Sequence, residues 1–104
     1  MFLVRIAAAA TLAAFIVHSP AEAQDDYDLL PDGEGKDMVY ALCSGCHSVR
    51  LVAQQGLSPK RWEKMLDWMV EEQGMAELDA DSHAVVMDYL TNHLNTDHRP
   101  SWVK

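Results

Sequence analysis

Two cysteines and a histidine lie within five residues of one another, in the run Cys43-Ser44-Gly45-Cys46-His47. This C-x-x-C-H spacing places two thiols on about one helical turn, with an imidazole directly after them. Each thiol can add to a vinyl group on one edge of a porphyrin, and the imidazole nitrogen can then bind the iron. Because Ser44 and Gly45 are small, the chain can lie against the ring edge. The run therefore predicts one covalently bound haem c, attached through Cys43 and Cys46, with His47 as the proximal iron ligand.

Three other kinds of site also use paired cysteines. A redox-active C-x-x-C of the thioredoxin type requires a βαβ setting, and no part of this chain has the pattern of a strand. A disulfide across so small a loop would stabilise the fold little. A closed zinc site needs four ligands, so His83, His93 or His98 would have to join the two cysteines. The haem interpretation needs no further cysteine and no strand.

The sixth iron ligand has several candidates. Met65 and Met69 lie on the apolar stripe of a predicted helix, where methionine commonly fills gaps in a core. Met75 directly follows Gly74, at which that helix is expected to stop, so its thioether can lie on a loop opposite His47. These positions favour Met75 as the distal ligand, with Met69, a histidine or an open site as the alternatives.

Helical periodicity predicts the elements that position these residues. A first helix of about ten residues runs over residues 35–43 and places Cys43 at its C-terminal end. A second begins at Ser58-Pro59, where a hydroxyl cap precedes a proline in the first helical position, and it ends at Gly74. Its apolar stripe contains Trp62, Met65, Leu66, Met69 and Val70.

A third helix is expected to begin near Asp79 or Asp81 and to place Val86, Tyr89 and Leu90 on one face. With three predicted helices and no period-two segment, the fold class is all-α. No segment of the chain repeats another.

The amino-terminal residues 1–23 have the features of a cleaved secretory signal peptide. Arg5 precedes an apolar run from Ile6 to Val17, which is too short to span a bilayer, and Ala21 and Ala23 supply small residues before the cleavage point. The chain is therefore expected to be exported to the periplasm, with no membrane span after cleavage. Residues 24–34 are predicted to be a mobile acidic leader, residues 35–95 the domain and residues 96–104 a C-terminal tail.

The formal net charge is −8, from 16 acidic and 8 basic residues. Cleavage would remove one charge of each sign and leave this value unchanged. Because none of the basic residues forms a cluster of the kind that binds phosphates, nucleic acid is excluded as a partner. The acidic surplus predicts a redox partner with a basic docking face. A mature chain of about 81 residues also usually needs a cofactor, metal or disulfide to complete its core.

Gly35, the C-x-x-C-H run, Met75 and the segment from Val85 to Leu90 together resemble class I monohaem c-type cytochromes. The resemblance covers residues 33–95. It implies a small cytochrome c-like fold of three main helices around one haem, in which the first and last helices cross and Gly35 meets Tyr89. It also implies that Met75 ligates the iron.

With both axial positions filled by protein, such a site has no place for a substrate, so it implies an electron carrier and not an enzyme. Residues 62–75 are similar to the small haem subunit or partner of periplasmic sulfite dehydrogenase, a molybdenum enzyme, which names a possible donor. The alternative is a five-coordinate haem protein with peroxidase-like or gas-binding activity, in which the sixth site would be open.

Overall fold

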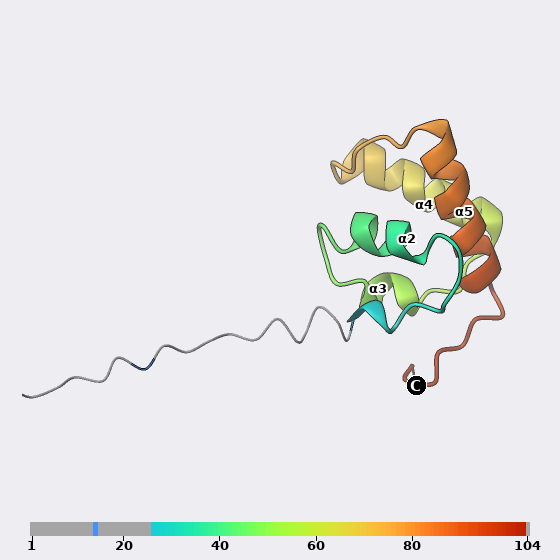
Figure 1. Ribbon diagram of the computed structural model, residues 1–104. Coiled ribbons are helices and arrows are strands. Elements are labelled where there is room, and N and C mark those ends of the chain that lie inside the picture. Colours follow the sequence, from blue (N-terminus) through green and yellow to red (C-terminus); the bar gives the residue numbers. More distant parts are fainter. Residues whose placement is uncertain (1–13, 15–25, 104) are drawn as a thin grey trace, which may run out of the picture.

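Residues 26–103, together with Ala14, are described by the computed structural model, and they form helices and no strands (Figure 1). The helices are α2 (Lys36–Cys43), α3 (Arg50–Ala53), α4 (Pro59–Glu72) and α5 (Ala80–His93). The all-α prediction is confirmed for this part of the chain, which is a small compact domain of four helices. No helix within it has the length and apolarity needed to cross a bilayer. The predicted signal peptide, residues 1–23, lies outside the described residues apart from Ala14.

Helices α2 and α5 pack against each other where α2 begins. Gly35 precedes α2 with a φ of 91°, a left-handed conformation that favours glycine. A Cβ placed on Gly35 would lie 3.1 Å from Cγ1 of Val85 and 3.2 Å from Cβ of Tyr89. The expected meeting of Gly35 with Tyr89 is therefore confirmed: only a residue without a side chain lets the two helices come so close.

Helix α4 begins and ends as its sequence predicts. Ser58 accepts a hydrogen bond from the Arg61 backbone N–H at 3.4 Å, and Pro59 occupies the first helical position. The helix ends at Glu72, and Gly74 then adopts a left-handed φ of 74°. These local signals fix the length of the helix that carries Met65 and Met69.

The end of α5 is tied to α4 through one backbone carbonyl group. The Leu94 oxygen accepts hydrogen bonds from the Trp62 indole Nε1–H at 2.8 Å and from the Leu57 N–H at 3.2 Å. Carbonyl groups at a helix end have no partner within the helix, so these bonds satisfy one that burial would otherwise leave unpaired. At the other end of α5, Asp79 caps the helix by accepting from the Ser82 N–H at 2.8 Å.

The short helix α3 is an addition to the three main helices that the sequence predicts. Its four residues follow Val49, whose side chain cannot cap the helix, and the Ser48 hydroxyl oxygen accepts a hydrogen bond from the Arg50 N–H at 3.2 Å. Val49, Val52 and Ala53 are buried at spacings of three and four residues, so one side of this single turn packs on the core.

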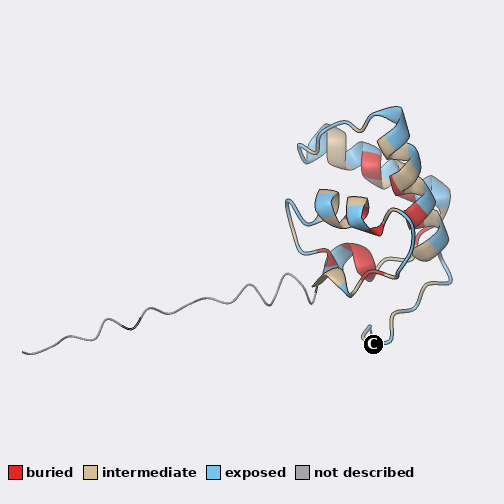
Figure 2. Cartoon of the chain, viewed as in Figure 1, coloured by how far each residue is buried: buried red, intermediate tan, exposed pale blue. Residues whose placement is uncertain are grey.

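The core lies between α2, α4, α5 and the turn of α3, where the buried residues of Figure 2 face one another. Its apolar members are Leu30, Val39, Val49, Val52, Ala53, Leu57, Trp62, Leu66, Val86, Tyr89, Leu90 and Leu94. Leu30 comes from the segment before α2, and the others come from the helices and the loops beside them.

The expectation of a mobile leader over residues 24–34 is wrong from Asp26 onward. Leu30 is only 2% exposed, and the Tyr89 hydroxyl donates a hydrogen bond to the backbone oxygen of Pro31. Lys36 is buried, forms an ion pair with Asp32 at 2.8 Å and lies 4.1 Å above the Tyr27 ring. The acidic composition concealed these apolar and aromatic side chains, which supply enough buried area and pairing to hold the segment on the domain.

The C-terminal tail also contacts the domain over its described residues. His98 Nε2 lies 2.8 Å from the carbonyl oxygen of Ala53, and the Arg50 guanidinium lies 4.8 Å above the Trp102 ring. Trp102 is half-buried against the core. The tail therefore packs along α3.

Candidate functional site

The C-x-x-C-H run borders a cavity of about 460 Å³. That volume falls within the range of about 300–1,000 Å³ typical of small-molecule and cofactor sites. Its walls come from the end of α2, the loop after it, the region of α3, one side of α4 and the loop after α4. Besides the motif, the lining includes Leu42, Leu51, Val52, Trp62, Met65, Trp68, Met69 and Met75, with Gln55 and Gln73 as its uncharged polar members.

Helix α2 delivers the first cysteine. Cys43 is the last residue of α2, and the Ser44 N–H donates to the Tyr40 carbonyl oxygen at 3.0 Å, which closes the final turn. Cys46 and His47 then lie in the loop, where Cys46 is exposed and His47 is half-buried. All three line the cavity, and both cysteines are free thiols. The structure therefore brings the three predicted motif residues to one wall of a single cavity.

The two thiols differ in their surroundings. Burial raises the pKa of Cys43 to about 11, because removing the thiolate from water disfavours the charged form. Cys43 is therefore a neutral thiol at neutral pH in the folded chain. Cys46 lies in the loop after α2 and is exposed to solvent.

His47 has a hydrogen-bond partner at one of its two ring nitrogens. Its Nδ1 lies 3.3 Å from the Ser48 carbonyl oxygen. In the tautomer with the proton on Nδ1, that nitrogen donates to Ser48 and leaves the lone pair of Nε2 available. A backbone carbonyl commonly orients metal-binding histidines in this way.

Three methionines line the same cavity. Met65 and Met69 lie one turn apart on α4, and Met75 lies in the loop. The Met69 carbonyl oxygen accepts from the Gln73 N–H at 3.1 Å and from the Met75 N–H at 3.0 Å, so the end of α4 holds Met75 beside it. Both predicted distal ligands, Met75 and Met69, are thus half-buried on the wall of one cavity, together with Met65.

The other histidines that a zinc site would need lie elsewhere. His83 pairs with Glu63 at 2.7 Å, and the His93 ring packs against Tyr89 with the ring centroids 4.8 Å apart. His98 contacts the backbone of α3, as described above. Over residues 26–103, no three His, Cys, Asp or Glu side chains form a group that could hold a metal ion. His47 is the one histidine among the described residues that line the cavity.

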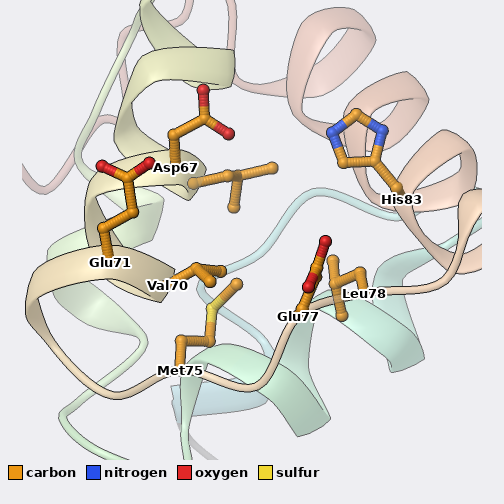
Figure 3. A pocket seen from close by; sticks show the side chains of 8 residues that line it. Asp67, Val70, Glu71, Met75, Glu77, Leu78 and His83 are labelled. Carbon is orange, nitrogen blue, oxygen red and sulfur yellow. The ribbon is translucent and has the colours of Figure 1, made fainter.

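Two further hollows border the cavity. One, of about 320 Å³, is lined by Asp67, Glu71, Glu77 and His83, and it shares Met75 with the main cavity (Figure 3). The other, of about 350 Å³, is lined by Arg61, Lys64, Met65 and Trp68, the last two of which also line the main cavity. Carboxylates thus gather at the Met75 side of the cavity, and cationic groups gather at its Trp68 side.

Several lining residues were not predicted from the sequence. Leu51, Gln55 and Gln73 belong to no motif, and Trp68 falls outside the apolar stripe of α4. Trp68 is three residues from Met65 and adjacent to Met69, so its helical position beside these two methionines is the one signal that places it near the site.

Comparison with known proteins gives no further constraint on this site. No protein-family model matches the chain, and no curated protein or solved structure matches it at a significant level. The interpretation of the cavity therefore depends on its own residues, their geometry and their chemistry.

Proposed function

We propose that this chain is a monohaem c-type cytochrome that carries single electrons in the periplasm. The observation that supports this most strongly is the cavity itself, in which both thiols, one imidazole and three thioethers line a largely apolar hollow of about 460 Å³. These are the groups that attach and ligate haem c. The packing of Gly35 against Tyr89 supports the finer proposal of a cytochrome c-like fold around the haem.

The donor set fits haem better than it fits zinc. Cys43 and Cys46 would form the thioethers, His47 would be the proximal ligand through Nε2, and Met75 would be the distal ligand, with Met69 as the alternative. Two thioethers, unlike two thiolates, add no charge to a wall that is largely apolar. When bound, the haem would supply a one-electron iron couple.

A methionine in the sixth position would leave no iron site open to a substrate, so the protein is proposed as a carrier and not as an enzyme. Methionine ligation favours the reduced iron and raises the reduction potential, which suits an acceptor of electrons from a dehydrogenase. A molybdenum-containing sulfite dehydrogenase is the proposed donor, with the chain as its haem subunit or acceptor. The net charge of −8 favours a partner that is basic overall.

The test is expression with its signal peptide in a host whose periplasm attaches haem c. We expect a coloured protein in which haem remains bound after denaturation, and the Cys43→Ser/Cys46→Ser double variant should lack it. The reduced protein should bind carbon monoxide poorly. A colourless product would contradict the haem proposal, and ready carbon monoxide binding would support the five-coordinate alternative.

The same preparation identifies the distal ligand. Met75→Ala should abolish the sulfur-to-iron absorption band of the oxidised protein and lower its reduction potential. Met65→Ala is the matched control, because it removes a thioether from the same cavity without removing the proposed ligand. Loss of the band in Met69→Ala, with its retention in Met75→Ala, would assign the ligand to Met69.

A further inference from the structure

Helix α4 carries its charges in the reverse of the order that stabilises a helix. Lys60 and Arg61 lie in the first turn, which has no acidic residue, whereas Glu71 and Glu72 lie in the last turn, which has no basic residue. The helix dipole favours negative groups at the N-terminus and positive groups at the C-terminus. This arrangement of charges therefore destabilises α4. A role for it must lie in contacts outside the helix.

The cationic half of α4 adjoins the proposed haem cavity. Arg61 and Lys64 line the same hollow as Met65 and Trp68, and the last two also form part of the cavity wall. Trp68 is 48% exposed, and both cationic residues are exposed. We refer to these four residues as the Trp68 surface.

The Trp68 surface combines the features of a contact patch for another protein. Its centre is an exposed tryptophan beside a half-buried methionine, and aromatic residues, methionine and arginine are the types enriched at protein interfaces. Its position at the cavity wall would place a partner close to the haem. Its charge is opposite to that of the molecule, whose net charge is −8.

We propose that the Trp68 surface docks a redox partner protein that presents a carboxylate to Arg61 and Lys64 and an apolar side chain to Trp68. The proposal rests on the proposed function and deepens it. At the other end of α4, the carboxylates around Met75 suit cationic side chains of the same partner. The negative molecule attracts a partner that is basic overall, and the reversed charges along α4 fix the orientation in which that partner docks.

The test uses a small anion in place of the unidentified partner. One electron passes from the reduced haem-loaded protein to hexacyanoferrate(III), which gives the oxidised protein and hexacyanoferrate(II). At about 0.1 M ionic strength, where charges are screened beyond about 10 Å, only groups near the contact site affect the rate strongly. We expect Lys64→Glu to slow this reaction by about five-fold, because it puts an anion where the trianion would dock.

Arg99→Glu is the matched control, since it makes the same change in net charge at an exposed residue of the tail that does not line the Trp68 surface. We expect it to change the rate by less than about 1.5-fold. Equal slowing by the two variants would overturn the proposal, because the net charge alone would then govern the approach. Failure of the haem proposal is distinguishable, since a protein without haem would show no haem absorbance change, although its free Cys43 and Cys46 thiols could still reduce hexacyanoferrate(III).

Binding can be read separately from electron transfer. Redox-inert hexacyanocobaltate(III) should shift the NMR signal of the Trp68 indole N–H in the haem-loaded protein, and Lys64→Glu should remove this shift. Sedimentation at low salt tests whether a second copy of this chain, and not a partner protein, covers the Trp68 surface. Self-association that Lys64→Glu abolishes would mean that the acidic end of a second copy covers the Trp68 surface, which would overturn the assignment to a partner protein.

Discussion

The crossing of α2 and α5 and the wall of the proposed haem cavity differ in how completely the chain buries its own apolar groups. At the crossing, Val39 is fully buried, and Tyr89 and Leu90 are each 1% exposed. At the cavity, Leu51 is 50% exposed and Trp68 48%, although both are large and apolar.

The difference shows which part of this small domain is complete without a cofactor. The crossing has interlocked side chains and a glycine that allows close approach, so nothing needs to be added there. Around the cavity, apolar and sulfur-bearing side chains line a hollow of about 460 Å³, and a flat apolar group placed in it would remove them from water. The cofactor would thus serve as the second half of the core.

The largest effect is expected from truncating the crossing. Leu90→Ala removes a side chain that is 1% exposed, and the resulting cavity should lower the free energy of unfolding by about 2–5 kcal/mol. In the haem-free chain, Leu51→Ala, the control at the cavity wall, should cost only about 1 kcal/mol, because half of that side chain is then in water. Urea denaturation of the haem-free proteins, followed by circular dichroism, measures both. Equal costs would mean that the two regions do not differ in this way.

The next effect concerns the close approach of the two helices. Gly35→Ala and Gly74→Ala both force an alanine into a left-handed conformation, which costs about 1–2 kcal/mol. At Gly35 the new Cβ also meets Val85 and Tyr89 at 3.1–3.2 Å, whereas at Gly74 nothing lies within 4 Å. The overpacking should add about 1–3 kcal/mol at Gly35 alone. If the two variants unfold at the same urea concentration, the crossing is looser than the structure indicates.

The longer helices α4 and α5 were the part of the fold most open to prediction from sequence. Their apolar residues recur with helical spacing, and Ser58, Pro59 and Asp79 mark the helix starts by local chemistry that needs no tertiary contact. Helix α3 was not predicted because a single turn of four residues is too short to show a helical period. The packing of residues 26–32 was not predicted because Leu30 is held by contacts with distant parts of the chain.

The candidate site was predictable in its chemistry and less so in its shape. The C-x-x-C-H run and Met75 could be identified one by one, because their residue types and spacing point to haem. The single stripe predicted for α4 is divided in the structure: Leu66 is buried in the core, Met69 is half-buried at the cavity, and Trp62 belongs to both. That division depends on where α5 and the motif loop lie, which helical periodicity cannot specify.

The smallest effect is expected at Asp79, which joins the loop of Met75 to the packed helix α5. Its carboxylate accepts hydrogen bonds from the Ser82 N–H at 2.8 Å and the Ser82 hydroxyl at 3.1 Å, and these bonds hold the pKa of Asp79 below its ordinary value. The stability that they provide is therefore fully present above about pH 4, and it is lost as the pH falls through the lowered pKa.

Asp79→Ala should thus lower the thermal midpoint slightly near neutral pH, and its difference from the unmodified protein should shrink toward pH 2.5. Asp81→Ala, which removes the same charge from the first turn of α5 but leaves the cap in place, is the control. A difference for Asp79→Ala that stayed constant down to pH 2.5 would show that the carboxylate does not cap α5. The loop that carries Met75 would then be held in place by the contacts of Met75 and Leu78 with the core, and not by the start of α5.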